Sequence, residues 1–131
     1  MSEFSERMKE RTMSFADAVL GLVDRLPRTP AGRVIAYQLA DSATAVAANY
    51  RATCNARSRR EFIAKLGVVV EEADESACWL ELVNRRRLLP ANEVRPVLVE
   101  ALEVRNVMAK SVGTARANLR QSNRPLNQLT R

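Results

Sequence analysis

The densest group of titratable side chains in this chain is the segment EEADE at residues 71–75. On a helix, Glu71, Asp74 and Glu75 would share one side, because residues three and four apart are neighbours there. Such a layer of carboxylates resembles a di-iron bundle, but that centre also needs Glu-x-x-His pairs. The chain contains no histidine. We therefore expect no metal and no cofactor, and we expect nearby arginines to form salt bridges with these acids.

The absence of histidine also argues against an enzyme. It removes the most common general base and the Ser-His and Cys-His nucleophile pairs, and the chain has no glycine-rich phosphate loop. Cys54 and Cys78 lack metal-ligand spacing and lie in apolar surroundings, which predicts buried free thiols in a cytoplasmic protein. We therefore predict no catalytic residues.

Arginine remains as the side chain in excess. The net charge is +6 and the isoelectric point is about 10.1, and nearly all of the basic residues are arginines. Arginine binds phosphate oxygens in a bidentate manner, although codon bias in a GC-rich genome gives the same composition. The candidate phosphate-binding residues form two runs: Arg57, Arg59, Arg60, Arg85, Arg86 and Arg87.

Two roles of these six arginines are compatible with the sequence. They could bind the phosphates of RNA or DNA through counterion release, with little reading of base sequence. Alternatively, arginines at helix ends could solvate the protein and neutralise the carbonyl ends of the helices.

Four helical segments must position these groups. Apolar residues at steps of three and four predict helices over about 5–26, 30–54, 58–85 and 92–121. Thr29 before Pro30 is a helix-start signal, Ser58 with Glu61 forms a capping box, and Asn92 is available to cap the last helix. The apolar stripes are Met8, Phe15, Val19, Leu22 and Leu26; Ile35, Leu39, Val46 and Tyr50; Ile63, Leu66, Val70, Ala73, Ala77 and Leu80; and Val94, Leu98, Ala101, Met108, Val112, Ala115 and Leu119.

Short loops between four helices favour antiparallel neighbours. We predict an all-α protein, an up-down-up-down four-helix bundle over residues 1–121, with a flexible basic tail at 122–131. No apolar run approaches the roughly 18 residues that span a bilayer. We expect no membrane partner.

The segment SATAVAANYR at 42–51 has no charge before its last residue. A helix with so little charged surface is usually buried on several sides. The sequence therefore predicts a homo-oligomer in which small and amide-bearing residues contact a second copy. The predicted interface residues are Gln38, Ser42, Ala45, Asn49 and Trp79. The alternative is one broad core with some alanines at the surface.

Two stretches, QLADSATAVAANYRAT and ARSRREFIAKLGVVVEEADESACWLELV, resemble the four-helix-bundle proteins encoded within intervening sequences of bacterial large-subunit ribosomal RNA. The resemblance covers about residues 30–90. It implies a cytoplasmic bacterial protein that forms a ring, commonly a pentamer. It also implies kinship with the accessory subunit of diversity-generating retroelements, which partners a reverse transcriptase and nucleic acid. A scaffold for a reverse transcriptase or another protein is therefore the alternative function, and no catalytic residues come with the resemblance.

Overall fold

The computed structural model describes residues 2–123, which form four α-helices and contain no strand. The helices are α1 (Glu3–Val23), α2 (Pro30–Cys54), α3 (Arg59–Arg85) and α4 (Ala91–Ser122). The predicted all-α class and the four helices are confirmed. Helix α4 ends one residue beyond the predicted boundary, and residues 124–131 of the predicted tail lie outside the described part of the chain.

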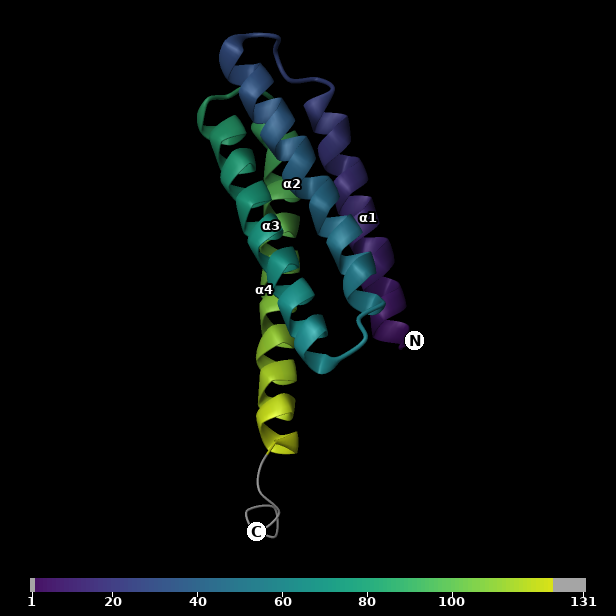
Figure 1. Ribbon diagram of the computed structural model, residues 1–131. Helices are drawn as coiled ribbons and strands as arrows, with labels where there is room; N and C mark the ends of the chain where they lie inside the picture. Colours follow the sequence, from purple (N-terminus) through teal and green to yellow (C-terminus); the bar gives the residue numbers. More distant parts are fainter. Residues whose placement is uncertain (1, 124–131) are drawn as a thin grey trace.

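The connections lie at alternating ends of the bundle (Figure 1). One end holds two loops, residues 24–29 between α1 and α2 and residues 86–90 between α3 and α4, and we call it the double-loop end. The single-loop end holds residues 55–58 between α2 and α3, and helix α4 runs past that loop (Figure 1). Helix α3 packs extensively against α2 and α4, whereas α1 and α4 contact each other far less.

Local hydrogen bonds set the starts of the helices. The hydroxyl of Thr29 accepts a hydrogen bond from the Gly32 N–H, and that of Ser58 accepts one from the Glu61 N–H, both at 3.1 Å. These two predicted caps are confirmed. The prediction for Asn92 is wrong: Pro90 precedes the first turn of α4, and no side chain caps it.

Helix α1 also begins and ends earlier than its apolar stripe predicted. The Ser2 hydroxyl accepts a hydrogen bond from the Ser5 N–H at 3.0 Å, so the helix begins at Glu3. It ends at Val23, although Leu26 is still buried. An apolar residue can therefore belong to the core without belonging to the helix.

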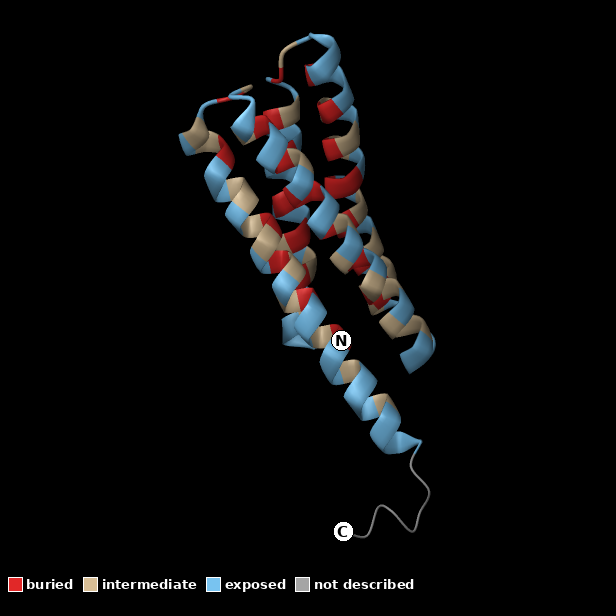
Figure 2. Ribbon diagram, turned by 90° about the vertical axis from the view of Figure 1, so that its left-hand side faces the viewer, coloured by how far each residue is buried: buried red, intermediate tan, exposed pale blue. Residues whose placement is uncertain are grey.

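The core follows the facing sides of the helices, where the buried segments gather (Figure 2). It includes Leu39, Leu66, Leu80 and Met108, none of which is exposed to solvent. The prediction of two buried thiols is wrong, because Cys54 is half-buried and Cys78 is exposed. Both are free, and Cys78 lies outward because it directly follows the core position Ala77 on α3.

Candidate nucleic-acid interface

The six arginines predicted to bind phosphate are all exposed, but they form two separate groups. Arg57, Arg59 and Arg60 lie at the single-loop end, and residues 85–87 lie at the double-loop end. Helix α3 has 27 residues and is therefore about 40 Å long. One protein chain thus presents two basic groups at opposite ends (Figure 1).

At the single-loop end the arginines come from three segments. Arg57 precedes α3, Arg60 lies in its first turn, and Arg116 and Arg120 lie on the last turns of α4. None of these four has an ion pair among the described residues. Arg59 donates a hydrogen bond from Nη1 to the Asn118 carbonyl at 3.1 Å, which ties the start of α3 to α4.

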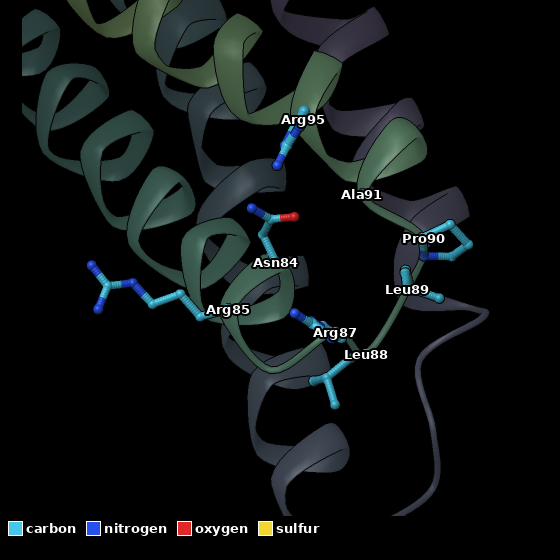
Figure 3. A pocket seen from close by; sticks show the side chains of 8 residues that line it. All are labelled: Asn84, Arg85, Arg87, Leu88, Leu89, Pro90, Ala91 and Arg95. Carbon is cyan, nitrogen blue, oxygen red and sulfur yellow. The ribbon is translucent and has the colours of Figure 1, made fainter.

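At the double-loop end the chain forms an open hollow of about 640 Å³ between the end of α3 and the start of α4 (Figure 3). Its lining is Asn84, Arg85, Arg87, Leu88, Leu89, Pro90, Ala91 and Arg95. The side chains of Arg95 and Asn84 point toward each other, whereas Arg85 points away from the hollow (Figure 3). Arg85 is paired with Glu81 at 2.9 Å, and Arg86 does not line the hollow.

Of the run at 85–87, Arg87 is thus the residue whose charge remains unpaired and beside the hollow. The site predicted from the sequence included neither Arg95 nor Asn84. Asn84 is in the last turn of α3, Arg87 follows the end of that helix, and Arg95 is in the first turns of α4. Only the packing of α3 against α4 brings their side chains together.

The backbone at Arg87 has an unusual conformation. Its φ is 54°, in the left-handed region that side chains other than glycine rarely adopt. The N–H of Arg87 donates to the Asn84 carbonyl at 3.1 Å and that of Leu88 donates to the Val83 carbonyl at 3.0 Å. These two bonds form a Schellman motif, which ends α3 and directs the chain sharply toward α4.

The acidic cluster at residues 71–75 lies on α3 between the two ends. Arg105 pairs with Asp74 at 2.7 Å, but Glu71, Glu72 and Glu75 have no ion pair within residues 2–123. The expected salt bridges therefore form at Asp74 alone. Partial burial raises the pKa of the Glu72 carboxyl, and the nearby charges of Glu75, Asp41 and Glu71 raise this pKa further. Among the described residues, no three or more Cys, Asp or Glu side chains lie together in a way that could hold a metal ion.

On α1 the charges are compensated across helices. The Arg11 guanidinium donates to Glu100 through Nε at 2.8 Å and through Nη2 at 2.7 Å, and it also binds Glu103 at 2.9 Å. At the double-loop end Arg25 pairs with Glu93. Paired charges therefore occur along the whole bundle, in its middle and at its ends.

The residues predicted to form an oligomer interface lie in different surroundings. Gln38, Ala45, Asn49 and Trp79 are half-buried. Ser42 is fully buried and accepts a hydrogen bond from the Ser76 hydroxyl at 2.9 Å. Ser42 therefore lies inside the α2–α3 contact of one chain, whereas the other four predicted interface residues are partly exposed. The reason is that the helical face that carries Ser42 also faces α3.

Within residues 2–123, no helix is long and apolar enough to cross a lipid bilayer.

Comparison with known proteins identified a matching family and a solved structure of similar fold. The family model described as 23S rRNA-intervening sequence protein matches residues 6–110. A crystal structure of a protein with unknown function from the S23 ribosomal protein family of Bacteroides thetaiotaomicron has a TM-score of 0.74 and 27% sequence identity with this chain. The match covers 80% of this chain and 97% of that chain. No curated protein matches this chain significantly.

Proposed function

This chain belongs to the 23S rRNA-intervening sequence protein family, as its sequence predicted, and from that premise we propose that it is a non-enzymatic, cytoplasmic protein that binds RNA phosphates. The observation that carries this proposal is a group of exposed arginines without acidic partners at each end of the bundle. None of these arginines has an ion pair among residues 2–123: they are Arg57, Arg60, Arg116 and Arg120 at the single-loop end, and Arg87 and Arg95 at the double-loop end. Unpaired guanidinium groups are available to replace the counterions of a polyanion.

The alternative explanation of these arginines is that they neutralise the carbonyl ends of helices. It accounts for Arg85, in the last turn of α3. It does not account for Arg57, Arg60 and Arg95, which lie next to helix N-termini where a positive charge is unfavourable. The positions of these three favour an external anion as their partner.

We further propose that the chain, an antiparallel up-down-up-down bundle, assembles into a homo-oligomer, and that this oligomer is a pentameric ring, as the family resemblance implies. The α2–α3 face supports an association of this kind. The Trp79 indole Nε1 is buried and has no hydrogen-bond acceptor among the described residues. Buried donors are normally paired, so an acceptor from a second copy would satisfy it. A ring would multiply each basic group by the number of copies.

Retention of RNA by the purified protein tests the binding proposal. Mixed RNA should be retained at about 0.1 M salt and released at about 0.5 M, because screening shortens the range of charge interactions. No retention at the lower salt would contradict the proposal.

Two double variants, compared with each other, show whether the unpaired arginines are the ones that bind RNA. Arg57→Gln with Arg60→Gln removes two unpaired charges, whereas Arg7→Gln with Arg105→Gln removes two charges that are already paired with carboxylates. For single-stranded RNA, the first variant should reduce the slope of log affinity against log salt by about 1.4, at about 0.7 per phosphate contact. The second should leave the slope nearly unchanged. Equal changes of slope in the two variants would mean that RNA affinity depends on the net charge of the protein and not on these particular arginines.

The oligomer has its own test. Ala45→Glu places a carboxylate at the half-buried α2 surface, where burial of a charge without a partner is costly. We expect a lower mass by light scattering. An unchanged mass and an unchanged melting temperature would mean that the subunits contact each other elsewhere.

A second function, a scaffold that binds a reverse transcriptase or another protein, is favoured by exposed apolar residues on α2. Val34 is 58% exposed and Tyr37 is 74% exposed. A pull-down from the native cell that is repeated with Tyr37→Ser tests it. A protein partner that the native chain recovers and the variant does not would support the scaffold.

A further inference from the structure

Building on the proposed RNA binding, we propose that the hollow at the double-loop end holds one unpaired nucleotide, which makes this end of the protein selective for single-stranded over duplex RNA. The proposal goes beyond phosphate binding, because it assigns a base to the hollow as well as a phosphate. Its residues are Asn84, Arg87 and Arg95 with the apolar loop 88–90.

The size of the hollow is the first argument. Its volume of about 640 Å³ lies within the range of pockets that take small molecules. A base within a duplex is stacked and paired, and it can enter such a space only after extrusion at a cost in free energy. A single strand presents its bases already unpaired.

The chemistry of the lining is the second argument. Arg87 and Arg95 supply guanidinium groups that can bind phosphate oxygens or stack on a base. The Asn84 amide has both a donor and an acceptor, which suits the polar edge of a base. No acidic residue lines the hollow, so nothing there repels an anion. Ala91, the first residue of α4, lies at the positive end of the helix dipole.

The apolar side of the hollow is the third argument. Leu88, Leu89 and Pro90 also line the hollow. Leu89 and Pro90 lie across from Asn84, whereas the Leu88 side chain points away from Asn84 and Arg95 (Figure 3). Inorganic phosphate has no apolar surface and could use only the arginines. A nucleotide can use both sides, because its base offers an apolar face and its phosphate offers the charge.

The single-loop end differs in this respect. The two hollows near it share Phe4, Phe62 and Ser111, and neither is lined by an arginine. The larger of them, about 590 Å³, is lined by Lys110 and by Asn118, whose carbonyl accepts a hydrogen bond from Arg59, but it lacks the lining arginines of the hollow at the double-loop end. We expect that end to bind single strands and duplexes alike.

The test compares a labelled poly-uridine strand with its duplex with poly-adenosine at about 0.1 M salt. The native protein should bind the single strand more tightly. Arg95→Gln and Asn84→Leu should each lower single-strand affinity about tenfold, a typical loss for one charged or stacking contact, and leave duplex affinity within about twofold. Arg60→Gln, at the other end, is the matched control and should lower both affinities by the same factor.

Two results would overturn the proposal while RNA binding itself holds: equal affinity of the native protein for both forms, or an equal loss for both forms in Arg95→Gln. If neither form of RNA binds at all, the proposed function fails. Titration with uridine monophosphate, followed by side-chain amide signals in NMR, then decides about the hollow. Shifts at Asn84 that Arg95→Gln abolishes and that inorganic phosphate does not reproduce would assign the hollow to a free nucleotide. If no such shifts appear, the hollow binds neither a free nucleotide nor a nucleotide of an RNA strand.

Discussion

The middle of the bundle and its double-loop end join their helices by different means. In the middle, side chains make the connections: Arg11 of α1 binds Glu100 and Glu103 of α4. Across the α2–α3 contact the Ser76 hydroxyl donates to Ser42. These side chains of the middle region therefore already have partners on a neighbouring helix and are not available to a ligand.

At the double-loop end, the backbone makes most of the connections. Gly32 in the first turn of α2 allows the Pro27 carbonyl to approach closely, and the Schellman motif at Arg87 turns the chain after α3. Arg25 with Glu93 is the cross-helix ion pair of this end. Because the backbone closes the turns, the side chains of Arg87 and Arg95 remain free to bind a ligand. Four substitutions, in order of decreasing effect, test this difference.

Gly32→Ala should have the largest effect. A Cβ at this position would overlap with the carbonyl oxygen of Pro27, which is backbone and cannot rotate away. We expect a loss of about 3 kcal/mol in the free energy of unfolding, measured with urea. The control is Gly67→Ala, whose Cβ would meet nothing within 4 Å and which should stabilise its helix by about 1 kcal/mol. Equal effects would show that the double-loop end is not closed by a tight backbone contact.

Arg11→Glu should have the next largest effect, because it places a third acid beside Glu100 and Glu103. We expect a loss of about 2 kcal/mol, which is typical of broken hydrogen bonds to charged groups. Arg7→Glu on the same helix is the control, since its partner Glu3 is 88% exposed and such pairs contribute less than about 1 kcal/mol. Thermal melts at low salt measure both. A small effect at Arg11 would mean that its pairs do not join α1 to α4.

Arg87→Gly should stabilise the fold. Glycine adopts a φ of 54° without the steric cost that arginine bears, so we expect a gain of about 1 kcal/mol. The same variant should bind single-stranded RNA more weakly, because it removes a guanidinium from the hollow. A higher melting temperature together with a lower affinity for RNA would show that Arg87 serves binding at a cost in stability. If the affinity is unchanged, Arg87 does not contact the ligand.

Glu72→Gln should have the smallest effect and should depend on pH. The pKa of Glu72 is raised in the folded state by burial and by Glu75, Asp41 and Glu71. The ionised carboxyl therefore destabilises the fold, and this cost grows as the pH rises above the unfolded value of about 4.3. At pH 7 the variant should be more stable by about 0.5 kcal/mol, and the difference should vanish near pH 4. A constant difference would assign the effect to packing.

The local features of this fold were readable from the sequence. A capping hydroxyl such as that of Thr29 or Ser58 bonds to an N–H three residues away, and an apolar stripe repeats within a turn or two. These interactions lie within one segment, so residue types and spacing suffice to predict the four helices, most of the core and the family. The prediction failed at Asn92, because α4 begins at Ala91, directly after Pro90, and Asn92 lies within its first turn.

Residue types and their local spacing thus specify the helices and the surplus of arginine, because both depend on composition or on residues that are near each other in the chain. Which arginines remain free depends instead on how the helices pack. Arg11 and Glu100 are 89 residues apart, and Arg95 meets Asn84 only through the packing of α3 on α4. Likewise, Ser42 faces α3 and Cys78 faces outward because the rotation of each helix about its axis is set by its neighbours. Contacts between distant segments depend on how whole helices pack, and no local spacing specifies that.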